Sequence, residues 1–432
     1  MKKVYLLSAF LFLISLNAQT NLRLLTGWGT RLYDINSNGN AVHSGGYYSY
    51  NTNTSTAIEP VADATNRLNN GENIAGSMPF VAADGSNLSQ AAYRKNGVWT
   101  PIGYFPGDIP GNSWFGEAKG ISANSMYVTG QMTSGNAGSS YPYIYNTQTN
   151  TLTKLTGDLL YNNGRGADVN DNGIVAGWVD RTDIFGAGTF RVPAYFDAAG
   201  VLHYIDFSTP EYGEAGDVNN AGQVVGYKGS KAFIYNINTN VYQSFNAPAG
   251  YTDAVFVSVS ENGVAVGYCG MIGDRETIIY HPSLGANPIL LTDLLISQNI
   301  PVTTFDTKLG TGMGVSPDGM YICGFDNTVP PIFAAGWIVK LDNSILSTTN
   351  VKDNTFKFNI YPNPVQDVLN ISSEKIIKSV SIYDVNGKMV IRDQLIDKIN
   401  AKIDVSMLNT GVYLGSATLN DGNIKSFKII KK

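Results

Sequence analysis

The sequence predicts an all-β protein: a β-propeller of about seven four-stranded blades, followed by a small immunoglobulin-like β-sandwich. Composition is the first reason, since only 15% of the 432 residues are charged, against about 25% in an average soluble protein. The chain holds 46 Gly and 25 Tyr instead, which favour turns and strands respectively. The second reason is a short motif that recurs along most of the chain, and such repeats typically build propellers or arrays.

The motif is clearest at Asp168–Trp178 (DVNDNGIVAGW). Better and poorer copies begin at Asp34, Leu68, Gly120, Asp217, Ser258 and Gly314. The turn positions of the seven copies are Gly39, Gly71, Ser125, Gly173, Gly222, Gly263 and Gly319. They stand about 47 residues apart on average, the length of one four-stranded blade. Seven copies predict seven blades, and six or eight remain open because Leu68–Gly76 lacks one residue of the pattern.

One copy reads as a four-stranded antiparallel meander. The expected strands are Ala167–Asn170, Ile174–Val179, Pro193–Asp197 and His203–Phe207, with a tight turn after the first. The turns after the first and third strands share one face of a propeller and are short here. The loops after the second strand and between blades form the opposite, irregular face. Binding residues tend to occupy variable loops on a rigid scaffold, so we expect the functional face there.

The copies resemble the extracellular repeat family called HAF, named for a motif like Lys231-Ala232-Phe233 after an N-x-x-G-x-V-V-G stretch. The resemblance covers about residues 30–340 and is better in Gly120–Asn146 and Asp168–Tyr235 than in the first two copies. It implies a secreted, propeller-like protein and no defined activity.

The first 18 residues are expected to be a signal peptide. Lys2 and Lys3 precede the apolar run Val4–Leu16, and Leu16-Asn17-Ala18 is a plausible cleavage site. A membrane span would need about 18 or more apolar residues, and this run is shorter. We therefore expect export and no membrane span.

The end of the chain differs from the repeats. We expect a propeller at residues 19–341, a polar linker at 342–355 and a separate domain at 356–432. Alternating segments such as Phe358–Asn370 and Val380–Val390 predict a small β-sandwich there.

Short motifs stand in this domain at Tyr361, Pro362, Asn363, Pro364, Tyr383, Asp384, Gly387, Lys388, Gly411, Tyr413, Lys431 and Lys432. In these residues the domain resembles the C-terminal sorting domain of type IX secretion, found in one phylum of Gram-negative bacteria. The resemblance implies passage through the periplasm, recognition by an outer-membrane translocon and cleavage in the linker by a sorting peptidase. The mature protein would then lie on the cell surface or be released.

Charge excludes one class of partner. The net charge of the whole chain is −5. Residues 352–432 hold 12 basic and 8 acidic residues, a net charge of +4, and the two lysines of the signal add +2. Residues 19–351 therefore have a net charge of −11. Such an acidic body argues against nucleic acid. Cys269 and Cys323 could form a disulfide or remain as two buried thiols, and with three distant histidines they do not suggest a zinc site.

Two repeat copies begin like calcium-binding loops, at Asp34–Gly39 and Asp168–Gly173. An EF-hand would also need Glu at its twelfth position, where this chain has Gly45 and Val179. The same residues form tight turns well, so we expect turns rather than calcium and no cofactor.

The irregular face is expected to carry aromatic, acidic and arginine side chains, which suit glycan or protein recognition. These candidates are Trp114, Tyr161, Arg165, Trp178, Asp180, Arg181, Tyr212, Glu214, Tyr251, Asp253, Asp274 and Arg275. The simpler interpretation is packing between blades and surface ion pairs. No catalytic motif is present. A binding module is therefore preferred over an enzyme degrading extracellular polysaccharide or peptide, and over a structural adhesin or matrix protein.

Overall fold

The computed structural model divides into two compact units, residues 1–348 and 349–432. It describes residues 21–341 and 358–432, except for these internal gaps: 26–29, 44, 59–66, 69–72, 112–113, 135–138, 157–162, 183–188, 207, 299, 301, 303–308, 327–334, 385–388 and 421–423. The expected signal peptide and linker lie outside the described residues.

The described residues of the first unit form seven four-stranded antiparallel sheets. The first sheet contains β2 (Asp34–Ile35), β3 (Asn40–His43), β4 (Gly46–Ser49) and β5 (Thr54–Ala57). The second sheet contains β6 (Arg67–Leu68), β7 (Ile74–Val81), β8 (Asn87–Lys95) and β9 (Val98–Pro101). The third sheet contains β10 (Gly116–Ile121), β11 (Tyr127–Ser134), β12 (Ser139–Asn146) and β13 (Thr151–Lys154). The fourth sheet contains β14 (Gly164–Val169), β15 (Val175–Thr182), β16 (Thr189–Phe196) and β17 (Leu202–Tyr204). The fifth sheet contains β18 (Gly213–Val218), β19 (Gln223–Lys228), β20 (Lys231–Asn236) and β21 (Val241–Phe245). The sixth sheet contains β22 (Ala254–Val259), β23 (Ala265–Cys269), β24 (Glu276–Tyr280) and β25 (Ile289–Leu290). The last contains β26 (Thr311–Val315), β27 (Tyr321–Asp326), β28 (Ala335–Lys340) and β1 (Leu22–Leu24).

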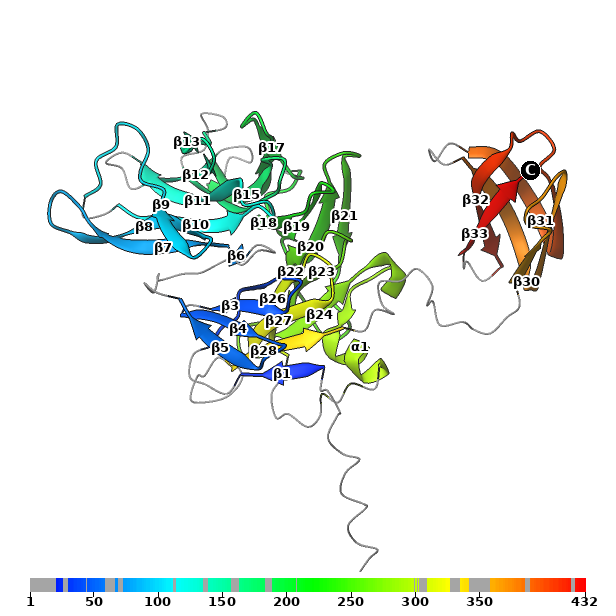
Figure 1. Cartoon of the computed structure of the whole chain (residues 1–432), viewed down its shortest axis with the longest axis horizontal. Helices are drawn as coiled ribbons and strands as arrows, with labels where there is room; N and C mark the ends of the chain where they lie inside the picture. Colours follow the sequence, from blue (N-terminus) through cyan, green and yellow to red (C-terminus); the bar gives the residue numbers. More distant parts are fainter. Residues whose placement is uncertain are drawn as a thin grey trace, which may run out of the picture. The chain divides into compact units, whose positions relative to one another are not determined.

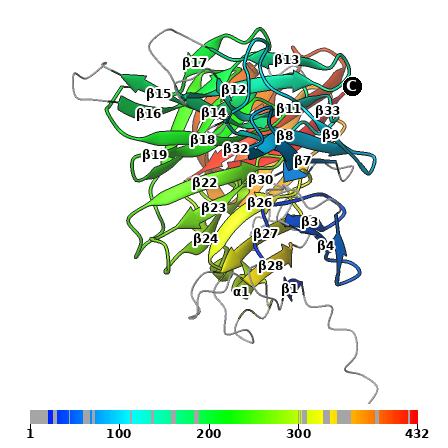
Figure 2. The same cartoon turned by 90° about the vertical axis from the view of Figure 1, so that its left-hand side faces the viewer.

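These sheets are the blades of a closed propeller, which confirms the predicted fold class. The first strand of each blade neighbours the first strand of the next, and β26 of the last blade neighbours β2 of the first. Figure 2 shows β14, β18, β22 and β26 following one another. The ring is closed by the start of the chain, because β1 pairs with β28 as the outer strand of the last blade (Figure 1).

Glycine in the second strand is required by a close approach to the first. A Cβ atom would lie 1.9–2.1 Å from a carbonyl oxygen of the first strand in five blades, at Gly130, Gly177, Gly226, Gly267 and Gly324. In the same five blades the register shifts by one residue in the first strand, as in a β-bulge. The bulged residues are Lys119, Ala167, Gly216, Val257 and Met313.

The Asp and Asn of the motif join neighbouring blades. Asp217 Oδ2 accepts hydrogen bonds from Ser258 Oγ and from the backbone N–H of Val259, each 2.9 Å long. Asn219 Oδ1 accepts from the N–H of Gln223 in its own turn, while Asn219 Nδ2 donates to the carbonyl of Ser260 in the next blade (2.9 Å). One side chain therefore closes a turn and ties two blades together.

The turn positions of the repeat have the expected backbone conformation. Positive φ, between 58° and 87°, occurs at Gly39, Ser125, Gly173, Gly222, Gly263 and Gly319. Gly71 lies outside the described residues. Glycine is favoured at these positions because other residues adopt positive φ at a cost.

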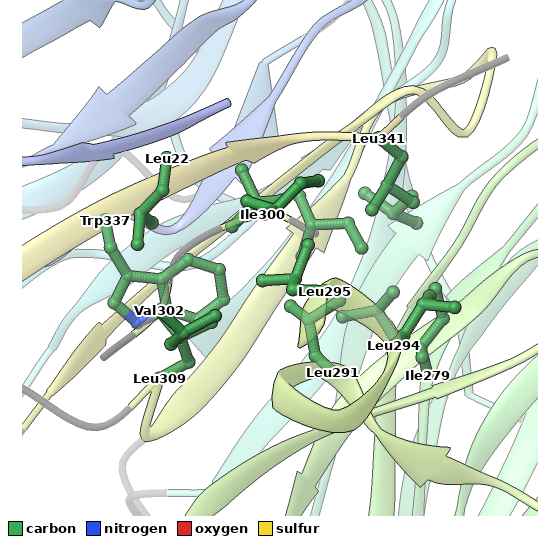
Figure 3. Close-up of a cluster of buried hydrophobic side chains, with 14 of the residues drawn as sticks. Leu22, Ile279, Leu291, Leu294, Leu295, Ile300, Val302, Leu309, Trp337 and Leu341 are labelled. Carbon is green, nitrogen blue, oxygen red and sulfur yellow. The ribbon is translucent and has the colours of Figure 1, made fainter. Parts of the chain in front are cut away.

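An insertion before the last blade adds the α-helix α1 (Leu291–Ser297), after a 3₁₀ turn at Pro282–Leu284. Leu291, Leu294 and Leu295 of the helix are buried in a cluster that also contains Ile279 and Trp337 (Figure 3). The helix therefore packs onto the sixth and seventh blades. Among the described residues no helix is long and apolar enough to cross a membrane.

The second unit is the expected small β-domain. Its strands are β29 (Phe358–Tyr361), β30 (Val368–Tyr383), β31 (Met389–Asp404), β32 (Gly411–Leu419) and β33 (Ile424–Lys431). Strand β30 pairs with β29, β31 and β32, and β32 pairs with β33. The domain has its own apolar core.

Both cysteines are fully buried, on β23 and β27, and neither is in a disulfide. The disulfide alternative is therefore not realised. Burial raises the pKa of the Cys269 thiol to about 12, so this thiol stays protonated at neutral pH.

We predict that Gly177→Ala lowers the free energy of unfolding by about 3 kcal/mol, because the new Cβ would force β15 away from the Arg165 carbonyl. Denaturant unfolding followed by tryptophan fluorescence measures this, since all five tryptophans precede residue 349. Gly45→Ala is the matched control: its Cβ would meet only the His43 ring, at 3.7 Å, and it should cost at most about 0.5 kcal/mol. Equal midpoints for the two variants would contradict the close-approach explanation.

We also predict that a thiol reagent labels neither cysteine in the native chain at neutral pH and labels both after unfolding, because both are buried. Mass spectrometry counts the added groups. An unfolded chain that takes up no label without prior reduction would show a disulfide instead.

Candidate functional site

A hollow of about 410 Å³ lies at the irregular end of the propeller. It is lined by residues of the first strands, by Arg31 and Tyr33 just before β2, by residues at the ends of the second strands, and by Arg275 just before β24. The opposite end of the ring, next to the tight turns, holds a hollow of only about 70 Å³. We name the larger hollow the central cavity.

The bulges direct residues into the central cavity. All five bulged residues line it, and in four of these blades the residue two positions earlier also lines it, namely Arg165, Glu214, Val255 and Thr311. The charged and aromatic lining residues are Arg31, Tyr33, Lys119, Arg165, Glu214, Tyr227, Phe256, Tyr268, Arg275 and Phe325. Four cations thus face one carboxylate.

Glu214 is held by two arginines. Its carboxylate accepts hydrogen bonds from Arg165 Nη2 (2.9 Å) and Arg191 Nη1 (2.5 Å). Arg191 also lies 3.8 Å from Asp180, and its guanidinium carbon stands 3.7 Å from the centre of the Trp178 ring. These ion pairs and the indole ring fix one wall of the cavity.

The other cations are placed differently. Lys119 pairs with Glu117. Arg275 stacks over the Tyr268 ring at 3.9 Å, and Arg31 over Phe325 at 5.1 Å. In the part of the chain that the structure describes, neither of these two arginines has a salt-bridge partner.

Burial keeps the tyrosines of the cavity protonated. It raises the pKa of Tyr227 to about 12, with a further contribution from the nearby Glu214 carboxylate. Burial also raises the pKa of Tyr268, against the effect of Arg275. Both phenols are therefore hydrogen-bond donors near neutral pH and are poorly suited to act as bases.

Three of the twelve residues predicted for ligand binding line the central cavity, namely Arg165, Glu214 and Arg275. Asp180 supports them through Arg191. Trp114 and Trp178 are only 6% and 4% exposed, so they pack beneath the surface rather than presenting a ring to solvent. Trp178 acts indirectly, as the platform for Arg191.

The other predicted residues that the structure describes lie outside the cavity lining. Arg181 stacks over Tyr204 at 4.6 Å, and Tyr212 is 57% exposed. Tyr251, whose pKa is raised by burial and by a hydrogen bond with Glu276, and Asp253 precede β22. Asp274 lies between β23 and β24, and its backbone N–H donates to Met271. Tyr161 is outside the described residues.

The expected long loop after Trp178 is mostly strand. β15 runs to Thr182 and β16 starts at Thr189, so Asp180 and Arg181 lie on a strand and not on a loop. The two strands extend to Thr182 and Thr189 because their backbone N–H and carbonyl groups hydrogen-bond to each other. The alternation of apolar and polar residues after Val179 is too weak in the sequence to predict this extension.

The motifs of the tail hold its last strand in place. Asn363 Nδ2 donates to the Lys428 carbonyl (2.7 Å), and the Ile430 N–H donates to Asn363 Oδ1 (2.8 Å). Tyr413 donates its hydroxyl to the Asn409 carbonyl. Gly415 faces the Phe427 ring, where a Cβ would come within 2.1 Å. Gly387 and Lys388 are outside the described residues.

The calcium-like stretches are tight turns. Asn36 Oδ1 accepts from the N–H groups of Asn38 and Asn40, and Asn170 Oδ1 accepts in the same way from Asn172 and Ile174. No group of three or more His, Cys, Asp or Glu side chains within the described ranges could hold a metal ion.

Comparison with known proteins identifies the tail. Residues 359–432 match the family model described as "Secretion system C-terminal sorting domain". Beta-agarase D of Zobellia galactanivorans is 37% identical over 76 residues, which are 18% of this chain and 15% of that protein. The chain thus ends in a type IX sorting domain, and the protein is exported to the cell surface or secreted.

Several solved structures are similar to most of the chain at low sequence identity and low TM-score. PorZ, a surface component of the type IX secretion system of Porphyromonas gingivalis, is 13% identical with a TM-score of 0.35, covering 86% of this chain and 52% of that one. The β-propeller domain of the Trilobed protease from Pyrococcus furiosus is 10% identical with a TM-score of 0.39, covering 76% and 93%. An oligogalacturonate lyase from Vibrio parahaemolyticus is 10% identical with a TM-score of 0.40, covering 76% and 93%.

We predict that Glu214→Gln lowers the free energy of unfolding by about 1–2 kcal/mol, because two half-buried guanidinium groups lose their shared carboxylate. Glu211→Gln, at an exposed position, is the control and should change little. Tryptophan fluorescence in denaturant compares the two. If both variants unfold like the parent chain, Glu214 does not organise the cavity wall.

Proposed function

We propose that this protein is an exported β-propeller binding module that recognises a glycan or protein ligand through the central cavity of its irregular face. One observation carries the proposal: a cavity of about 410 Å³ with arginines and tyrosines converging from several blades. Volumes of about 300–1,000 Å³ with a few converging polar groups are typical of small-molecule sites. On this proposal the repeats are of the HAF type.

Exposed side chains near the central cavity also support a binding function for the irregular face. Met271 and Ile272 follow the second strand of the sixth blade, and each is 78% exposed. Tyr212, just before β18, is 57% exposed. Exposed apolar and aromatic side chains beside a cavity are typical of ligand contacts.

The cavity favours binding over hydrolysis. Retaining and inverting glycosidases need two carboxylates about 5–10 Å apart. Among the described residues that line the cavity, Glu214 is the only carboxylate, and it is engaged by Arg165 and Arg191. Such a carboxylate is placed to organise arginines rather than to transfer protons.

The route of export follows from the ends of the chain. We propose that residues 1–18 are removed as a signal peptide, that the translocon recognises the sorting domain, and that a sorting peptidase cuts within residues 342–355.

We predict that the chain without its first 18 residues is retained on at least one member of a panel of polysaccharides and surface proteins, without releasing reducing ends or peptides. Ala167→Trp should abolish retention, because Ala167 lines the cavity and an indole there would fill it. Affinity chromatography and reducing-end assays measure both results.

Ala199→Trp is the matched control, since Ala199 is exposed in the turn between β16 and β17 on the opposite face. Retention of both Trp variants would overturn the assignment of the cavity. Release of sugar or peptide by the parent chain would replace binding with an enzymatic function.

A further inference from the structure

We infer that the central cavity takes an anionic sugar unit, carboxylated or sulfated, from a short saccharide or a chain end. The inference rests on the proposed binding function and adds the class of ligand. The observation behind it is the meeting of Arg31, Lys119, Arg165 and Arg275 with a single carboxylate, Glu214.

The charges around the cavity do not balance. Its lining residues carry +3 in total. Their ion-pair partners add Arg191, Glu117 and Asp180, which leaves +2. The cavity therefore has a positive net charge, whereas residues 19–351 as a whole have a net charge of −11.

Arg31 and Arg275 are the groups best placed to bind an anion. Each lies over an aromatic ring, which holds the flat guanidinium in one orientation. Neither has a salt-bridge partner within the described ranges, and Arg275 Nε is buried without a hydrogen-bond partner there. An arginine held in this way offers paired N–H donors to a carboxylate or sulfate.

The remaining lining groups suit a sugar better than an acidic peptide. Tyr227 and Tyr268 keep their hydroxyl protons, and Thr311 Oγ1 is buried with no partner among the described residues. These hydroxyls can bond to sugar hydroxyl and ring oxygens, while aromatic faces cover the apolar face of a sugar ring. An acidic peptide would leave most of these donors unused.

The same charges limit the length of the ligand. Screening at physiological ionic strength reduces charge effects beyond about 8 Å, so the cavity's cations act only on groups close to them. A long polyanion would lie over the acidic surface of the domain, where like charges repel it. We therefore expect binding to depend on the unit in the cavity and to gain nothing from further anionic units.

The test uses the chain without its first 18 residues and isothermal titration with size-matched oligosaccharides. The probes are uronic-acid oligomers, sulfated galactan oligomers, neutral galactan oligomers and polyglutamate. At least one anionic oligomer should bind about tenfold or more tightly than the neutral one, and added salt should weaken it. Comparison of the uronic-acid oligomers with the sulfated galactan oligomers shows whether the cavity prefers a carboxylate or a sulfate. Equal binding of the neutral oligomer, or a preference for polyglutamate, would overturn the inference.

Variants locate the binding groups. Arg31→Gln and Arg275→Gln should each weaken anionic binding about tenfold, and Arg275→Lys should restore part of it. Arg181→Gln is the control, because Arg181 also stacks over a tyrosine but does not line the cavity. If Ala167→Trp blocks binding while the arginine variants do not, the binding function stands and the anionic class is wrong. If no probe and no panel member binds, the proposed function itself fails.

Discussion

The close approach of the first and second strands, seen in five of the seven blades, is the constraint on which the central cavity depends. A glycine without Cβ lets the second strand lie against a carbonyl of the first, as at Gly177 and Gly226. The adjacent bulge then turns one extra residue of the first strand toward the central cavity. Backbone sterics thereby determine which positions line the cavity, whatever side chains those positions carry.

Much of the fold could be predicted because its determinants are local. The turn glycines need positive φ, and an Asn such as Asn170 caps its own turn, so both leave a regular trace in the sequence. The closure of the ring by Leu22–Leu24 could not be predicted in the same way. Its partner, β28, lies more than three hundred residues away, and three residues carry no periodic signal.

The candidate site was predicted in part. Arg165, Glu214 and Arg275 were predicted from their charge and their place near the irregular face, although Arg165 and Glu214 lie at the starts of β14 and β18 and only Arg275 lies between strands. The predicted set did not contain Arg31, which lies three residues before β2, or Lys119 and Arg191, which lie within β10 and β16. Trp178 was expected to be an exposed ring, whereas its neighbours bury it. A usable signal existed: Arg31 stands three residues before Asp34, as Arg165 stands before Asp168 and Glu214 before Asp217.

That comparison separates two kinds of position within one repeat. The position fixed by sterics holds glycine in the five blades with a bulge, because any side chain at Gly177 or its equivalents would meet a carbonyl of the first strand. The positions three residues before the motif have no such restriction, and they hold Arg31, Glu117, Arg165, Glu214, Val255 and Thr311 in six blades. A ring built from near-identical blades can therefore be charged unevenly at little cost in stability. The uneven charge leaves Arg31 and Arg275 in the cavity lining without a salt-bridge partner in the described ranges, and these are the groups that the proposed anionic ligand would contact.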